Sequence, residues 1–344
     1  MRRTVAPFAL ALAGGLLAAC RSTPTAPAPA PAPSAAASAP AAGVVLGRDE
    51  RFVVYQPGDD DTLRTIAVRF LGDERRAWAI REANDGADAQ PGRPLVVPLR
   101  ALRPGGVEPE RYQTVPILCY HRFGPSASKM TVTPANFAAQ LDWLADNGYE
   151  VVALARLVGW LEGRESLPPR AVVITIDDGY ESAWHYALPL LRRHGFPATL
   201  FVYTDFVGSG GALSWAQLEE LAASGLVDVQ SHSKSHRDLV ERNPDESDAQ
   251  YRQSIEAEAR VPQELLEKRL HLAQRFYAYP YGDANEIVLD TLARHHVDLG
   301  LTVNAGGNPF WAQPLLLRRT MIFGEFDLAA FKARLQTSRA VATP

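Results

Sequence analysis

The alternation of short apolar runs with amphipathic stretches between residues 113 and 335 constrains the fold more than any other feature. A run such as 171–176 is rich in β-branched residues, which favours a strand, whereas 137–144 places apolar side chains at helical spacing. Strands that alternate with helices form α/β domains with largely parallel sheets. The sequence therefore predicts an α/β domain over residues 113–335.

Four of the strand-like runs end in residues that can bind a metal ion or transfer a proton. These ends are Tyr120-His121, Asp177-Asp178-Gly179, Ser231-His232 and Tyr279-Pro280-Tyr281-Gly282. In α/β barrels the active site is built from the carboxyl ends of the strands. We therefore expect these four segments to converge on one site, although they lie far apart in the sequence.

Adjacent carboxylates at the end of a buried strand are unfavourable, because both lose hydration and they repel each other. A bound cation would remove this cost at Asp177 and Asp178. One of these carboxylates, together with His232 and His236, would give a metal ion three protein ligands and leave a position for water. The combination favours a catalytic metal site. Taken singly, the same residues also fit a turn with solvated acids and two surface histidines.

Three segments resemble the first three motifs of carbohydrate esterase family 4, the NodB-type polysaccharide deacetylases. They are residues 175–180, 232–236 and 279–282, in the order that the family has them. The resemblance implies a distorted (β/α) barrel that removes acetyl groups from N-acetylated amino sugars. It also implies one divalent metal ion, zinc by preference, with cobalt and nickel as alternatives.

The resemblance assigns roles to individual residues. It makes Asp178, His232 and His236 the metal ligands. It makes Asp177 the general base, and the backbone N–H of Tyr281 a donor to the developing oxyanion. The substrate is expected to be a polysaccharide that contains N-acetylglucosamine, either peptidoglycan or an exported poly-N-acetylglucosamine.

The chain departs from the family pattern in two places. Many members orient the base with an arginine where this chain has Ala278, so Arg275, Arg318 or Arg319 would have to replace it. Many members also take their general acid from a histidine near the C-terminus, but no histidine follows His296.

We therefore expect His121, at the end of the first strand of the domain, to be the general acid. An imidazole suits proton transfer near neutral pH. A purely structural role, in which this histidine only caps its strand, is the alternative.

Residues 1–19 predict a bacterial lipoprotein signal peptide. Two arginines precede an apolar run that is too short to span a bilayer comfortably, and the run ends in Leu17-Ala18-Ala19-Cys20, which resembles a lipobox. A lipid on Cys20 would anchor the exported chain to the cell envelope, on the periplasmic side of the outer membrane in a Gram-negative cell. Cys119 lies in an apolar run and is expected to be a buried, inert thiol.

Residues 20–50 are rich in Ala and Pro and predict an extended spacer after the lipidated cysteine. Residues 101–112 predict a second linker, and residues 336–344 a tail. The formal net charge is -4, which offers no electrostatic attraction for nucleic acid. We therefore expect no nucleic-acid partner.

Residues 51–100 resemble a LysM module, a small strand-helix-helix-strand domain that binds chains of N-acetylglucosamine. The resemblance rests on the Gly-Asp and Thr-Leu pairs of 58–63, on Ile66-Ala67, on Asn84 and on Val97-Pro98. It places a glycan-binding function on Gly58, Asp59, Thr62 and Asn84. One departure is the insertion of Asp60 and Asp61 between the two pairs.

Two other functions fit parts of the pattern. A zinc peptidase would carry two histidines four residues apart on a helix, but position 233 is Ser where that motif needs a glutamate base. An inactive envelope lipoprotein would use both domains only to hold glycan. The presence of both aspartates and both histidines favours the enzyme.

Overall fold

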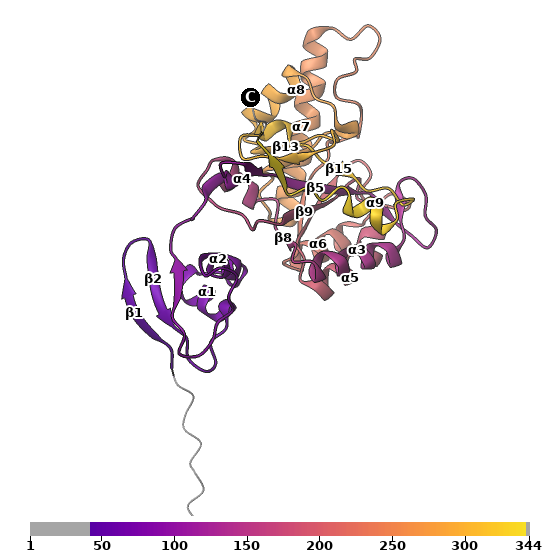
Figure 1. Cartoon of the computed structure of the whole chain (residues 1–344). Helices are drawn as coiled ribbons and strands as arrows, with labels where there is room; N and C mark the ends of the chain where they lie inside the picture. Colours follow the sequence, from indigo (N-terminus) through magenta and orange to yellow (C-terminus); the bar gives the residue numbers. More distant parts are fainter. Residues whose placement is uncertain (1–41, 342–344) are drawn as a thin grey trace, which may run out of the picture. The chain divides into compact units, whose positions relative to one another are not determined.

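The computed structural model of the chain describes residues 42–341 (Figure 1). The predicted signal peptide and Cys20 lie outside these residues. Within the described part of the chain, no helix is long and apolar enough to cross a membrane.

The N-terminal part of the described chain is a three-stranded antiparallel sheet with two helices. Its elements are β1 (Val44–Arg48), β2 (Phe52–Gln56), α1 (Leu63–Leu71), a short 3-10 turn η1 (Glu74–Arg76), α2 (Ala77–Ala83) and β3 (Leu95–Pro98), and the strand order is β1-β2-β3. The apolar sides of these elements form a small core that includes Val53, Ile66, Ile80 and Val97. The periodicity over 51–100 indicated β2, α1, α2 and β3.

The extra strand β1 corrects one predicted boundary. It lies inside the 20–50 segment that the composition indicated as spacer, and it pairs with β2. All five of its residues are exposed, so it lacks the alternation of buried and exposed positions that identifies a strand.

The C-terminal domain is an α/β fold around a mostly parallel sheet. Its strands are β5 (Val115–Tyr120), β8 (Glu150–Val151), β9 (Ala171–Ile176), β10 (Ala198–Val202), β11 (Val227–Ser231), β12 (Phe276–Ala278), β13 (Leu299–Leu301), β14 (Gly307–Asn308) and β15 (Thr320–Met321). The main strand order is β13-β12-β11-β10-β9-β5-β14, with β15 beside β5 and β8 beside β9. All pairs are parallel except β14 with β5. The curled, open sheet agrees with the predicted distorted (β/α) barrel.

Helices connect the parallel strands, as the sequence predicts. They are α3 (Pro134–Asp146), α4 (Arg156–Leu161), α5 (Leu188–His194), α6 (Trp215–Ala223), α7 (Asp248–Leu270), α8 (Glu286–Arg294) and α9 (Leu328–Lys332). The longest, α7, is capped by Ser247, whose side chain accepts from the Gln250 N–H in a capping box, and it packs against α6 and α8 (Figure 1).

The central strands are buried on both faces. Every residue of β5 and β9 is buried, which is typical of parallel strands covered by helices. Successive side chains of β9 enter different cores: Val172 and Ile174 join one apolar cluster, whereas Ala171 and Val173 join another. This alternation fixes the phase of the strand and therefore the direction of the residues that follow it.

The two ends of the domain pair with each other. Strand β4 (Arg111–Gln113) forms an antiparallel pair with β16 (Ser338–Ala340). These residues lie in the segments predicted as linker (101–112) and tail (336–344), so both predictions are wrong at these positions. Neither segment has strand periodicity, and a pairing across more than 220 residues leaves no local signal in the sequence.

Candidate active site and metal centre

The carboxyl ends of four parallel strands bring the predicted site residues together. Asp177 and Asp178 follow β9, and His232 follows β11. His121 follows β5, and Tyr281 lies in the turn η4 (Pro280–Gly282) after β12. Since the carboxyl ends of parallel strands share one edge of the sheet, residues from distant motifs meet at that edge.

Three side chains offer a set of metal ligands. One ligand atom each from Asp178, His232 and His236 lies within 4.8 Å of the other two. Asp178 Oδ1 is 3.5 Å from His232 Nε2 and 3.3 Å from His236 Nε2. Ligand atoms at about 2.0–2.1 Å from a tetrahedral zinc ion lie about 3.3 Å apart, so the donor set fits such an ion.

The backbone selects the ring nitrogen that His232 presents to the site. Its Nδ1 donates to the Ala278 carbonyl oxygen at 2.8 Å, which leaves the Nε2 lone pair directed toward Asp178. A second hydrogen bond of this kind is the usual support of a metal-binding histidine. Ala278 supplies this support through its backbone carbonyl group, so the contact does not depend on the side chain at this position.

Asp178 is held in its ionised form. Burial opposes ionisation, but the close imidazoles of His232 and His236 outweigh it and keep the pKa of Asp178 well below its usual range. A carboxylate that is anionic at neutral pH is the form that binds a cation.

Asp177 lies beside the ligand set in a fully buried ion pair. Its Oδ1 accepts from Arg319 Nη1 at 2.7 Å, and neither side chain is more than 2% exposed. Burial raises the pKa of Asp177, but Arg319 and then His232 reverse this effect and leave the pKa below its usual value. The carboxylate is therefore able to accept a proton from a nearby water molecule.

Of the three arginines that could contact the base aspartate according to the sequence, Arg319 is the one that does so. Besides Asp177, it contacts the Thr302 carbonyl oxygen through Nε at 2.9 Å and Thr175 Oγ1 through Nη1 at 3.2 Å. Arg318 points elsewhere and reaches the Ala305 carbonyl oxygen at 3.4 Å. Arg275 pairs with Asp298.

Cys119 approaches the same aspartate from β5. Its thiol donates to Asp177 Oδ2 at 3.4 Å, and burial raises the pKa of the thiol well above its usual value. This burial agrees with the predicted inert thiol. Its contact with Asp177 has no signal in the local sequence, because Cys119 lies in β5 and Asp177 follows the neighbouring strand β9.

His121 lies at the same edge. One side-chain nitrogen, sulfur or oxygen atom each of His121, Cys119 and Asp177 lies within 4.8 Å of the other two. Burial lowers the pKa of His121, and the negative charges of Asp177 and Asp178 oppose this effect only in part. A mostly neutral imidazole beside the base is close enough to take part in proton transfer.

Several residues of the site have backbone conformations that residues other than glycine rarely adopt. Positive φ angles occur at Asp178 (77°), Ser233 (78°), His236 (61°) and Tyr281 (59°). Such angles cost energy at residues other than glycine and are concentrated at functional sites.

Aromatic side chains surround the open side of the site. The rings of Tyr203 and Tyr281 lie 5.0 and 5.1 Å from the His236 ring, and Tyr281 is 62% exposed. Tyr203, Tyr180 and Phe206 also line a cavity of about 560 Å³. The place of Tyr203 and Phe206 at this cavity could not be predicted from the sequence, because nothing in their local pattern distinguishes them from core residues.

The predicted glycan-binding residues Gly58, Thr62 and Asn84 have structural contacts inside their module. Thr62 caps α1 by accepting from the Thr65 N–H, and the Gly58 N–H donates to Asp61 Oδ2 at 2.9 Å. Asn84 donates to the Ile80 and Val96 carbonyl oxygens and accepts from the Val96 N–H.

The inserted Asp61 also has a structural role in this module. Its carboxylate accepts from Tyr55 Oη at 2.6 Å and from Arg69 Nη2 at 3.1 Å. Glycan binding by Gly58, Asp59, Thr62 and Asn84 stays a prediction.

Comparison with known proteins agrees with this fold. Residues 164–300 match the family model Polysaccharide deacetylase. The structure of IcaB from Ammonifex degensii is similar, with a TM-score of 0.59, 28% identity and coverage of 65% of this chain and 98% of IcaB. The Streptococcus pyogenes deacetylase PplD in complex with acetate has a TM-score of 0.58, 26% identity and the same two coverages.

One curated relative aligns with a smaller share of this chain than these two structures do. The poly-beta-1,6-N-acetyl-D-glucosamine N-deacetylase of Escherichia coli (strain K12) is 27% identical over 211 residues, which is 52% of this chain and 31% of that protein. The chain thus spans about a third of that relative's length.

Proposed function

We propose that the chain, whose C-terminal domain is a polysaccharide deacetylase domain, hydrolyses acetamide groups on polysaccharides that contain N-acetylglucosamine. The observation that carries this proposal is the ligand set of Asp178, His232 and His236 beside the Asp177–Arg319 ion pair. The reaction adds water across the amide bond and releases acetate and a free amine.

The residues divide the reaction among them. A divalent ion held by Asp178, His232 and His236, which we propose to be zinc, would supply an activated water molecule and polarise the acetyl carbonyl group. Asp177 accepts the proton of the attacking water.

Two further residues complete the reaction. The Tyr281 N–H donates to the oxygen that gains negative charge, where fixed donors contribute most. His121, which is mostly neutral in the resting site, takes up the proton that Asp177 has accepted and passes it to the amine as the C–N bond breaks.

Two polysaccharides compete as the substrate. The name of the Escherichia coli relative favours poly-β-1,6-N-acetylglucosamine, whereas the LysM-like module favours peptidoglycan. Acetate release from purified sacculi should be compared with release from soluble N-acetylglucosamine oligomers. Release from neither substrate would contradict the proposed activity.

We also propose that the protein acts at the cell envelope. Support comes from the signal-like segment that ends at Cys20 and from the Ala- and Pro-rich spacer after it. Replacement of Cys20 by Ser should release the protein from the membrane fraction, which fractionation and immunoblotting would detect.

Substitution of His121 by Ala should lower kcat about 10²-fold or more, the usual contribution of a general acid, while the bound metal is retained. Steady-state kinetics and metal analysis measure the two quantities. The matched control is His185→Ala, which removes an exposed imidazole from the same domain. A wild-type rate, or a loss of metal along with the rate, would show that His121 has a different role.

Deletion of residues 42–100 should weaken retention on insoluble glycan and leave hydrolysis of short soluble oligomers nearly unchanged. The module would act by raising the effective concentration of a polymeric substrate, which does not alter the chemical step. A pull-down with sacculi or chitin, together with kinetics on oligomers, checks both parts. Equal retention of the shortened chain would make the module a spacer.

A further inference from the structure

The segment that joins the two metal-binding histidines is held by one carboxylate on α7. Glu258 Oε2 accepts from the backbone N–H groups of Lys234 and Ser235, each at 2.9 Å. Glu258 Oε1 accepts from Ser235 Oγ at 2.6 Å. This carboxylate therefore accepts three hydrogen bonds from two residues that lie between His232 and His236 in the sequence.

Glu258 is unusual because it is an acid in the interior. It is 6% exposed, and no Lys or Arg among the described residues forms an ion pair with it. Burial of an unpaired carboxylate is unfavourable unless hydrogen bonds compensate for it. The contacts that compensate here come from the metal-binding segment and not from the helix.

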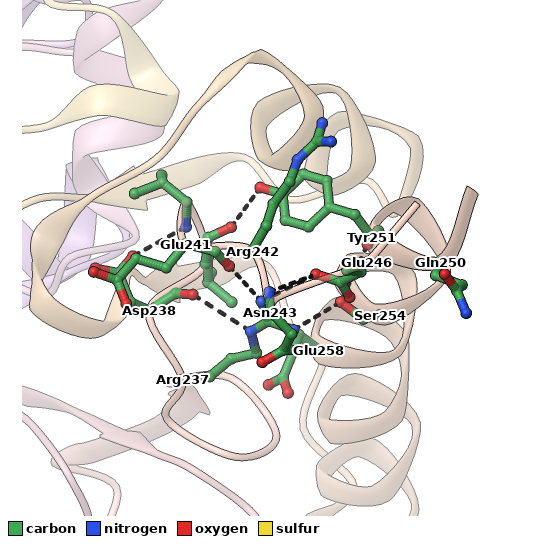
Figure 2. A network of polar contacts seen from close by, with 12 residues as sticks. Arg237, Asp238, Glu241, Arg242, Asn243, Glu246, Gln250, Tyr251, Ser254 and Glu258 are labelled. Carbon is green, nitrogen blue, oxygen red and sulfur yellow. Dashed lines mark hydrogen bonds and ion pairs between the residues drawn. The ribbon is translucent and has the colours of Figure 1, made fainter. Parts of the chain in front are cut away.

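The same face of α7 also forms hydrogen bonds with the segment that follows His236. Ser254, one helical turn before Glu258, accepts from Arg237 Nη1 at 3.0 Å. Tyr251, a further turn back, donates from Oη to the Leu239 carbonyl oxygen at 2.6 Å. Figure 2 shows these side chains projecting from the helix toward the loop. The helix thus contacts the segment 234–239 at successive points.

The segment needs such support because its backbone is strained. Ser233 and His236 both have positive φ angles, a conformation that persists only where the surrounding structure imposes it. Inside the segment, Ser233 Oγ accepts from the His236 N–H at 2.9 Å. The external contacts to the two residues between them come from Glu258 and from Asp205, whose carboxylate accepts from the Lys234 ammonium group and whose N–H donates to the Lys234 carbonyl oxygen at 2.9 Å.

We propose that Glu258 is a positioning residue for the metal centre: its carboxylate sets the shape of the 233–236 turn and thereby the distance between the two imidazoles. This inference rests on the proposed metal site. Groups behind metal ligands commonly change metal affinity or activity by about 10–100-fold when they are substituted. The effect here should come from the reach of the carboxylate oxygens and not from their charge.

Two variants separate reach from charge. Glu258→Asp keeps the charge but withdraws the oxygens by one methylene group, so it should weaken zinc affinity about 10–100-fold. Glu258→Gln keeps the reach, because the amide oxygen can accept both N–H groups and the Ser235 hydroxyl can turn to accept from the amide nitrogen. Its zinc affinity should stay near that of the wild type.

The measurement is a zinc titration of the metal-stripped full chain in competition with a chromogenic chelator. Glu264→Asp is the matched control, because Glu264 is an exposed residue of α7 that pairs only with Arg260 among the described residues. Melting of each metal-free variant checks folding. With saturating zinc, KM should be unchanged in Glu258→Asp, since the residue does not contact substrate.

The outcomes distinguish the two proposals. If the wild type does not bind zinc, the proposed metal site fails. If the wild type binds zinc and His232→Ala does not, but Glu258→Asp binds as tightly as the wild type, the positioning role is wrong. A loss of affinity in Glu258→Gln as large as in Glu258→Asp would also overturn it, because charge would then be the cause.

Discussion

Treatment with a strong chelator should reduce acetate release to the uncatalysed level, and added zinc or cobalt should restore it. The proposed site uses a cation both to activate water and to polarise the carbonyl group, so its removal leaves only substrate binding and one unassisted base. Metal content and acetate release, measured on the same samples, should rise together as zinc is added back.

A variant isolates the ligand set from other effects of the chelator. His232→Ala should bind no metal at one equivalent and lose more than about 10²-fold in rate, since even groups behind the ligands contribute up to that amount. His296→Ala, an exposed imidazole on the same domain, is the control. Full activity in metal-free His232→Ala would remove the metal from the mechanism.

The second large effect is expected at the buried ion pair. Arg319→Met removes the cation beside Asp177 at similar side-chain volume. Burial would then raise the pKa of Asp177 and favour its protonated form, which cannot act as the base. The rate should fall about 10²-fold or more. The free energy of unfolding should fall by about 3–5 kcal/mol, because one charge is left buried without its partner.

The neighbouring arginine provides the control for this prediction. Arg318→Met alters an exposed side chain whose described contact is one carbonyl group at 3.4 Å, so its rate and stability should stay close to those of the wild type. Kinetics at saturating zinc, with denaturant unfolding of the same samples, measure both quantities. A wild-type kcat in Arg319→Met would show that Asp177 needs no cation or is not the base.

The part of the site that follows from strand ends could be predicted from the sequence. Asp177 and His232 come directly after strands, Tyr281 lies in the turn after another strand, and parallel strands share the edge at which they end. The residue types themselves suggested a metal, since two imidazoles and a carboxylate are good ligands. Local pattern and elementary chemistry were enough for this step.

The parts that depend on contacts across the fold could not be predicted. Arg318 and Arg319 are adjacent, and only the phase of the chain before β15 decides which one enters the interior. Glu258 looks like any acid on a long polar helix, and its burial depends on how α7 packs over the metal-binding segment. Strands β1 and β16 depend on partners that local sequence does not identify.

The left-handed turns at the catalytic edge imply that the most active sequence of this domain is not its most stable one. Four non-glycine residues hold conformations that glycine would adopt without strain, and each costs about 1–3 kcal/mol. Three of the four are needed for the proposed chemistry through a side chain or a backbone N–H aimed by the turn. A copy of the domain released from selection for hydrolysis would therefore be expected to gain thermal stability by drifting toward glycine at these positions.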